Sequence, residues 1–169
     1  MRTCHILPLL AAMALAGCMA HPLQLKVPSR AMAPLISFGS YVETEQYGRN
    51  LPERFDVVVV GSPAEERIYV FRVVGLPGEH VKLTPDGVYI DGGYLEPPAG
   101  VQYSSEAAGQ PTPKSEFQLR RNYYVLLGDN SEHARDSRFF GPLPRRRIYG
   151  KVSDIHPADP DESYQDLED

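Results

Sequence analysis

The sequence predicts a single domain with a mostly β fold, and three observations support this. Short runs of β-branched and aromatic residues alternate with turn residues, as is typical of strands joined by tight turns. The 169 residues include 16 prolines, 14 glycines and 10 tyrosines, which favours a loop-rich β fold over a helical bundle. No segment shows a long helical period, and the length suits one domain with a real core.

The first residues are typical of an export signal rather than of a folded element. Residues 1–20 have one arginine near the start, an apolar run over residues 6–16 and small residues at the end. The apolar run is too short to cross a bilayer, which takes about 20 residues. The motif Leu15-Ala16-Gly17-Cys18 resembles a bacterial lipobox, which implies removal of residues 1–17 and a lipid on Cys18. A plain signal peptide with a chance cysteine is the alternative.

Lipidation of Cys18 would leave the mature protein without a thiol. The other cysteine, Cys4, lies in the removed segment, so neither a disulfide nor a cysteine metal site is expected. Residues 18–26 are then expected to form a tether, and residues 27–153 the β domain.

The strands are predicted from short apolar runs and the turns between them. Residues 55–60 read FDVVVV, and this unbroken apolar run predicts a strand buried on both faces. Residues 68–74 form a second β-branched run. Pro85-Asp86-Gly87 is a hairpin signal, and Asp91-Gly92-Gly93 predicts a further turn into Tyr94 and Leu95. The other predicted strands are residues 81–83, 88–90, 123–127 and 148–152.

Three polar segments are expected to lie at the surface. Residues 97–114, rich in Pro, Gly, Ser and Ala, predict a long exposed loop. Residues 154–169 contain seven acidic residues and no Lys or Arg, which predicts a disordered tail, with an acidic interaction tail as the alternative. Arg145-Arg146-Arg147 is a small basic run that would face either anionic lipid headgroups or solvent. The net charge of −5 argues against a nucleic-acid partner, which requires a basic surface.

Four blocks of the sequence resemble the bacterial type I signal peptidases, serine endopeptidases that use a Ser/Lys dyad. The blocks are PSRAMAPLI at 28–36, LPERFDVVVV at 51–60, YVFRVVGLPGEHV at 69–81 and GDNSEHARDSRFFGPLP at 128–144. They stand in the family's order, and the resemblance covers roughly residues 27–152. It implies a signal peptidase-like β-sheet that coils into a compact, barrel-like domain.

The residues that would carry the family's chemistry are absent from these blocks. In such a dyad a Ser hydroxyl attacks the peptide carbonyl and a neutral Lys amine takes its proton. The resemblance places Ala31 at the nucleophile position, Phe71 at the base position and Ala134 at the position of the serine that orients the lysine. Loss of a nucleophile or base costs on the order of 10⁶ in rate. The sequence therefore predicts a catalytically degenerate member of the family.

Ser29 matches the family's oxyanion-hole serine, a role that needs a donor aimed at the developing negative charge. Without a nucleophile, a turn serine beside Pro28 is the simpler interpretation. A displaced nucleophile in an active signal peptidase is the alternative, although neither Lys26 nor Lys82 matches the family's base.

The remaining motif residues are intact and are expected to support the loop beneath the former active site. Asp136 and Arg138 are expected to brace that loop, as the resemblance implies. No metal or other cofactor is expected, because His80 and His133 are isolated and lack metal-ligand spacing. The motif residues are Gly128, Asp129, Asn130, Asp136, Ser137, Arg138 and Gly141.

The resemblance also implies a groove that binds an extended peptide beside the segment after the nucleophile position. Strand addition in such a groove needs no catalytic residue. The sequence thus predicts a membrane-anchored lipoprotein of the bacterial cell envelope that faces the periplasm and binds extended peptides or an exported protein. A scaffold without peptide binding is the remaining alternative. The expected groove residues are Met32, Pro34, Leu35, Ile36, Phe38 and Phe71, with Phe71 on its floor.

Overall fold

The computed structural model describes residues 23–61, 67–108 and 110–158, and in them the fold is mostly β, as predicted. Cys18 and the predicted signal peptide lie outside the described residues, as does the tail from residue 159. The strands are β1 (Leu23–Lys26), β2 (Tyr41–Glu45), β3 (Val57–Gly61), β4 (Ile68–Gly75), β5 (His80–Thr84), β6 (Gly87–Ile90), β7 (Gly93–Leu95), β8 (Glu106–Ala107), β9 (Gln110–Pro111), β10 (Glu116–Gln118), β11 (Tyr123–Leu127), β12 (Leu143–Pro144) and β13 (Ile148–His156). The helices are α1 (Ser137–Phe140) and the 3₁₀ turn η1 (Arg145–Arg147), and no described helix could cross a membrane.

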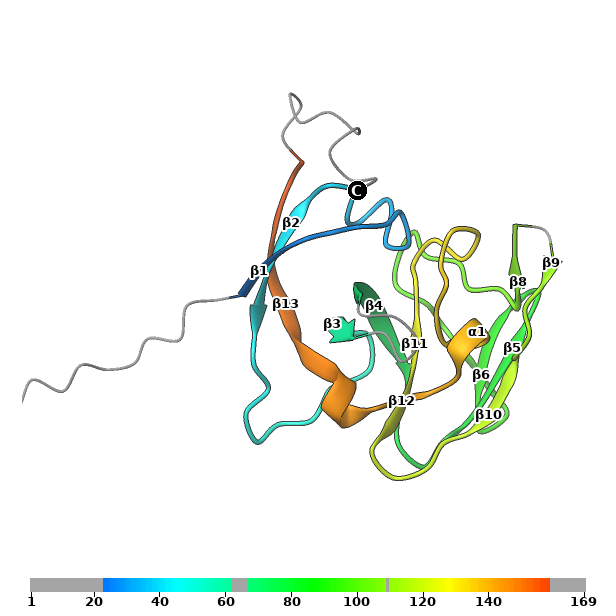
Figure 1. The fold of residues 1–169 in the computed structure, drawn as a ribbon. Coiled ribbons are helices and arrows are strands. Elements are labelled where there is room, and N and C mark those ends of the chain that lie inside the picture. Colours follow the sequence, from blue (N-terminus) through cyan, green and yellow to red (C-terminus); the bar gives the residue numbers. More distant parts are fainter. Residues whose placement is uncertain (1–22, 62–66, 109, 159–169) are drawn as a thin grey trace, which may run out of the picture.

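The strands form one large curled sheet and two smaller ones (Figure 1). The large sheet is antiparallel, with the strand order β1-β2-β13-β3-β4-β11-β12. A four-stranded sheet, β10-β5-β6-β7, lies beside it, and β8 and β9 form a small ribbon. Although β13 is the last strand in the sequence, it therefore lies between β2 and β3 in the large sheet.

The central hairpin of the large sheet follows the sequence pattern. Val58, Val59 and Val60 of β3 are fully buried, which confirms that this strand is covered on both faces. Alternate residues of β3 and β4 enter two separate clusters: Val58 and Phe71 face one, and Val59 and Val70 face the other. The predicted start at Phe55 is wrong, because Phe55 has a positive φ of 70°, which interrupts extended backbone.

Three predicted boundaries differ from the structure. Residues 23–26 of the expected tether form β1, because Leu25 and its neighbours pair along β2. Residues 154–156 of the expected tail continue β13 and pair with β2. The expected exposed loop at 97–114 contains β8 and β9, and Val101 and Tyr103 within it are buried against the small sheet.

Candidate functional site

The structure brings Ala31, Phe71 and Ala134 together in one apolar cluster. Ala31 lies in the turn after residue 27, Phe71 in β4 and Ala134 in the loop after β11. Their exposed fractions are 2%, 0% and 3%, so none of the three side chains reaches solvent. The three positions that the sequence resemblance assigned to nucleophile, base and orienting serine are therefore neighbours, and all three are apolar.

Phe71 fills the position at which a catalytic amine would be needed. Its ring stacks on Tyr69 with centroids 5.6 Å apart and 13° between the planes. It also packs against Phe140 at 6.1 Å and a 48° tilt. Val58, Leu126 and other aliphatic residues complete the cluster together with Tyr124. Since these contacts are apolar, the cluster offers no acceptor for a hydroxyl proton at this position.

Gly128 allows the motif loop to approach the nucleophile position closely. A Cβ on Gly128 would lie 2.6 Å from the carbonyl oxygen of Ala31 and would also collide with Ala134. The amide of Asn130 donates to the same Ala31 oxygen at 2.9 Å. Gly128 and Asn130 thus hold the backbone of Ala31 against the loop, even though Ala31 has no reactive group.

Asp136 and Arg138 form a fully buried ion pair beneath this loop. The Arg138 guanidinium donates to both carboxylate oxygens of Asp136, at 2.8 and 2.9 Å, and to backbone carbonyls of Ser104, Glu106 and Ser131. Asp136 also accepts from the amide of Gly128 at 3.0 Å. One side chain therefore ties the motif loop to the segment at residues 104–106.

The neighbouring motif residues shape the short helix that carries this arginine. The Ser137 hydroxyl accepts from the amide of Leu126 at 2.9 Å, which fixes the start of α1 against β11. Gly141 ends α1 with a φ of 88°, a conformation that glycine adopts easily.

A second buried ion pair, which the sequence reasoning missed, joins β4 to the motif. Arg72 donates to the two carboxylate oxygens of Asp129 at 2.8 and 2.6 Å and to the carbonyl of Phe55 at 2.9 Å. Burial alone lowers the pKa of Arg72, but the hydrogen bonds and charge of Asp129 outweigh it and raise that pKa. An arginine inside an apolar strand was the available signal, because buried arginines are nearly always paired.

Tyr103 lies close to this pair and carries an unusual hydroxyl. Among the described atoms the hydroxyl has no hydrogen-bond partner, although the side chain is buried. Burial raises the pKa of Tyr103, and the charge of Asp129 raises it further. The phenol is therefore neutral at physiological pH, and it cannot act as a base there.

The expected peptide-binding segment is only partly at the surface. Met32 and Ile36 are buried in the core, so their expected place in an open groove is wrong. Residues 31–36 form turns rather than a strand, with Ala33 N–H donating to Arg30 O and Ile36 N–H to Met32 O. These turns direct Met32 and Ile36 inward.

The other expected groove residues differ in how far they are exposed. Leu35 is 48% exposed, Pro34 is exposed and Phe38 is half-buried. Phe71 does not form the floor of an open groove either, because its ring is enclosed by the cluster.

The two neighbours of β4 cover it unequally. β11 pairs with β4 only at Arg72, Val73 and Gly75, whereas β3 pairs with β4 along its whole length. Val70 and Phe71, in the part of β4 that β11 does not reach, are 3% and 0% exposed, so their backbone is covered and offers no open edge.

Ser29 is oriented toward its own turn. Its hydroxyl oxygen accepts from the amide of Ala31 at 3.4 Å, an arrangement common for serines in turns. The ammonium of Lys26 lies over the ring of Tyr41, 5.8 Å from its centre. Lys82 belongs to β5 of the other sheet. This geometry fits the turn interpretation of Ser29 better than a displaced nucleophile.

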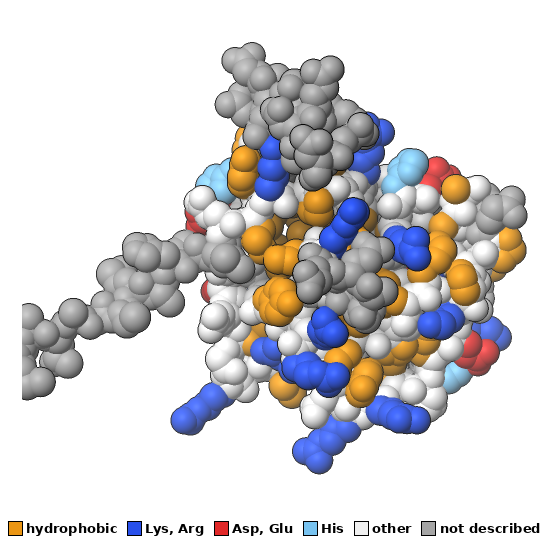
Figure 2. All heavy atoms as spheres, in the orientation of Figure 1, with side chains coloured by type: hydrophobic (Ala, Val, Ile, Leu, Met, Phe, Trp, Pro, Cys, Tyr) orange, Lys and Arg blue, Asp and Glu red, His pale blue; other side chains and the backbone are white. Residues whose placement is uncertain are grey.

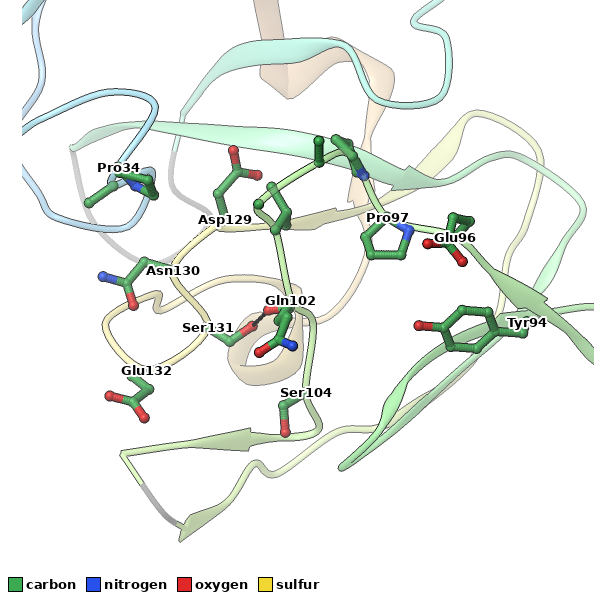
Figure 3. A pocket seen from close by; sticks show the side chains of 15 residues that line it. Pro34, Tyr94, Glu96, Pro97, Gln102, Ser104, Asp129, Asn130, Ser131 and Glu132 are labelled. Carbon is green, nitrogen blue, oxygen red and sulfur yellow. Dashed lines mark hydrogen bonds between the residues drawn. The ribbon is translucent and has the colours of Figure 1, made fainter.

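A cavity of about 900 Å³ with a mixed polar and apolar lining lies beside the Ala31 turn (Figure 3). Tyr94 and Glu96 lie on one wall, and Asn130 and Glu132 lie on the other, with Pro34 at the edge. The Ser131 hydroxyl donates to the carbonyl of Gln102 at 3.1 Å and links the two segments. The cavity separates the motif loop from the small sheet and has no lysine or arginine in its lining.

Comparisons with known proteins decide the family. The family model described as "Signal peptidase, peptidase S26" matches residues 1–156. The chain belongs to the signal peptidase S26 family. This confirms the family that the four sequence blocks indicated.

Relatives and a solved structure agree with this result. Signal peptidase I V of Bacillus subtilis is 29% identical over 140 residues, covering 76% of this chain and 82% of the relative. Signal peptidase I of Pseudomonas aeruginosa is 27% identical over 190 residues, covering 84% of this chain and 67% of the relative. A crystal structure of a signal peptidase I from Enterococcus faecalis V583 matches with a TM-score of 0.50 and 28% identity, covering 62% of this chain and 98% of that one. The expected signal peptidase-like fold is confirmed.

Proposed function

We propose that this chain is a non-catalytic signal peptidase-family protein that binds extended polypeptide at the membrane of the bacterial cell envelope. The observation that carries the proposal is the apolar cluster of Ala31, Phe71 and Ala134. Hydrolysis by a dyad needs a nucleophile and a neutral base within hydrogen-bond reach. The cluster supplies neither, and Ser29 faces its own turn.

Binding without cleavage is supported by the exposed part of the turn after Ala31. An extended peptide that lies beside Ala33 and Pro34, which line the cavity of about 900 Å³, and against the exposed Leu35 would gain main-chain hydrogen bonds. Because main-chain pairing supplies most of the energy, we expect weak affinity, with a Kd of roughly 10 µM to 1 mM, or about −7 to −4 kcal/mol.

Anchoring is proposed from the sequence. The lipobox-like motif at Cys18 would attach lipid to the mature N-terminus and hold the domain at an envelope membrane facing the periplasm. A lipid mass on Cys18, lost in Cys18→Ser, is the expected result, and an unmodified Cys18 would contradict it.

Turnover tests the loss of catalysis. We expect the purified full-length protein in detergent to leave a preprotein intact under conditions in which an active signal peptidase I cleaves it. Ala31→Ser combined with Phe71→Lys should restore weak cleavage at best, because Ala134 cannot orient the amine. Clear cleavage by the unaltered protein that Ser29→Ala abolishes would show that Ser29 is a displaced nucleophile.

Peptide titration tests binding separately. A peptide with an Ala-x-Ala pattern should shift backbone amide resonances at residues 32–38 as it is added. The matched control is the same peptide with N-methylated alanines, which keeps the side chains but removes main-chain donors and should not bind. Absence of shifts at millimolar peptide would leave only a scaffold role.

A further inference from the structure

Three loops that are distant in the sequence meet at one end of the large sheet. They are residues 47–51 after β2, residues 119–122 before β11 and residues 145–149 at η1. The amide of Arg145 donates to the carbonyl of Asn122 at 2.8 Å, which joins the second loop to the third. The Arg145 guanidinium lies over the Tyr47 ring, 5.0 Å from its centre, which joins the first loop to the third.

These loops concentrate positive charge in an otherwise acidic protein. Their sequences are YGRNL, LRRN and RRRIY, with no Asp or Glu among them, whereas the net charge of the chain is −5. The six arginines are called the basic end: Arg49, Arg120, Arg121, Arg145, Arg146 and Arg147. Arg49, Arg120, Arg121 and Arg146 are exposed to solvent. The nearest buried acid, Asp56, is already engaged by Lys151 at 2.8 Å and by Tyr47 at 2.6 Å.

The same end also exposes apolar and aromatic surface. Leu51 is 60% exposed and Tyr149 is 46% exposed, and both belong to these loops. Figure 2 shows Lys and Arg side chains interspersed with hydrophobic ones over this face, with few acidic groups. Arginine beside tyrosine and leucine suits the interface of a bilayer, where aromatic side chains sit at headgroup depth.

The chain enters the fold at this end. Leu23, the first residue of β1, pairs with Thr44 at the end of β2, and β2 leads directly into the loop at 47–51. Residues 18–22 can span at most about 18 Å. A lipid on Cys18 would therefore hold the bilayer within reach of the basic end. β1 then carries the chain away, so that Lys26 pairs with Tyr41 near the Ala31 turn.

We propose that the basic end is the membrane-contacting surface of the domain and that it binds an anionic phospholipid bilayer. A basic residue close to an anionic surface strengthens binding by about fivefold. The proposal fits the lipid anchor of the proposed function but does not depend on it, because the arginines belong to the folded domain. Docked in this way, the protein would hold the Ala31 turn away from the bilayer by the length of β1.

The test measures partitioning of the full-length Cys18→Ser protein, which cannot carry lipid. Vesicles of phosphatidylcholine with about one third phosphatidylglycerol are compared with vesicles of phosphatidylcholine alone. The ratio of the two partition coefficients measures the electrostatic part of membrane binding, because the N-terminal apolar segment contributes equally to both coefficients. We expect a ratio well above one that falls toward one near 1 M salt, where charges are screened beyond about 3 Å.

Two variants with the same change in net charge locate the surface. The triple substitution Arg120→Gln/Arg121→Gln/Arg146→Gln should lower the ratio about 100-fold, as three fivefold losses predict. The control Arg30→Gln/Lys114→Gln/Arg135→Gln removes three exposed cations from elsewhere and should change it less than about threefold. Equal losses in both variants, or no preference of the parent for anionic vesicles, would overturn the proposal.

Discussion

Phe71 and Arg72 are consecutive residues of β4, yet the surroundings of their side chains are opposite in kind. Phe71 enters an apolar cluster with Ala31 and Ala134, where the family's chemistry would need polar groups. Arg72 forms a bidentate pair with Asp129 of the motif loop. The buried polar residues of the motif hold backbone in place, and they are intact. The positions assigned to reaction chemistry contain only packing side chains. The scaffold of this family can therefore be separated from its dyad.

The largest effect should come from breaking the deeper of the two ion pairs. Arg138→Met would leave the Asp136 carboxylate fully buried without its partner and would free four backbone carbonyls. Removing one partner of a buried pair costs about 3–5 kcal/mol, and we expect the upper end or more. Urea unfolding followed by circular dichroism measures it. A loss below about 1 kcal/mol would show that the motif is not architectural.

A smaller but pH-dependent loss should follow Phe71→Lys, which returns an amine to the apolar cluster. Burial without a partner should lower the pKa of this lysine, so the unfolded state binds the extra proton more readily. Stability should therefore be lowest below the depressed pKa and should recover as pH rises toward about 10.4. We expect a cost of about 4 kcal/mol at pH 7. The matched control is Phe71→Met, whose smaller loss should not depend on pH.

The smallest effect should come from a partly solvated polar network at the start of β3, between Tyr47 and Lys151 of β13. Asp56 accepts hydrogen bonds from Tyr47, Lys151 and the amide of Glu53. Burial alone raises the pKa of Asp56, but the hydrogen bonds from Lys151 and Tyr47 outweigh it and lower that pKa.

Asp56→Asn should therefore cost about 1–3 kcal/mol at pH 7. The pKa of Asp56 is lower in the folded state than its ordinary value of 3.8. The stabilisation that its charge gives the fold is therefore complete above pH 3.8 and is lost as the pH falls through the folded-state pKa. Urea titrations of both proteins at pH 7 and pH 2.5 check it. An equal difference at the two pH values would mean that Asp56 carries no stabilising charge.

The sequence predicted those features that depend on local pattern or on whole motifs. The valines of β3, the hairpin at Pro85-Asp86-Gly87 and the strand at residues 123–127 all lie where short runs placed them. The family blocks predicted that Ala31, Phe71 and Ala134 would belong to one site.

Other features depend on contacts that no local pattern contains. Met32 and Ile36 point inward because of the turn geometry at residues 31–36. The pair of Arg72 and Asp129 joins residues 57 positions apart. The convergence of three arginine-bearing loops likewise follows from the strand order.

The apolar packing of Ala31, Phe71 and Ala134 has an evolutionary consequence. Ala31→Ser alone would create a hydroxyl with no base to activate it, and Phe71→Lys alone would bury an amine with no nucleophile to deprotonate. Neither single change yields a functioning dyad, and the second would destabilise the fold. A single substitution toward a dyad therefore gives no gain in activity, and at least two substitutions must occur together. Under the proposed loss of catalysis, the packing of the interior would thus oppose a return to a dyad.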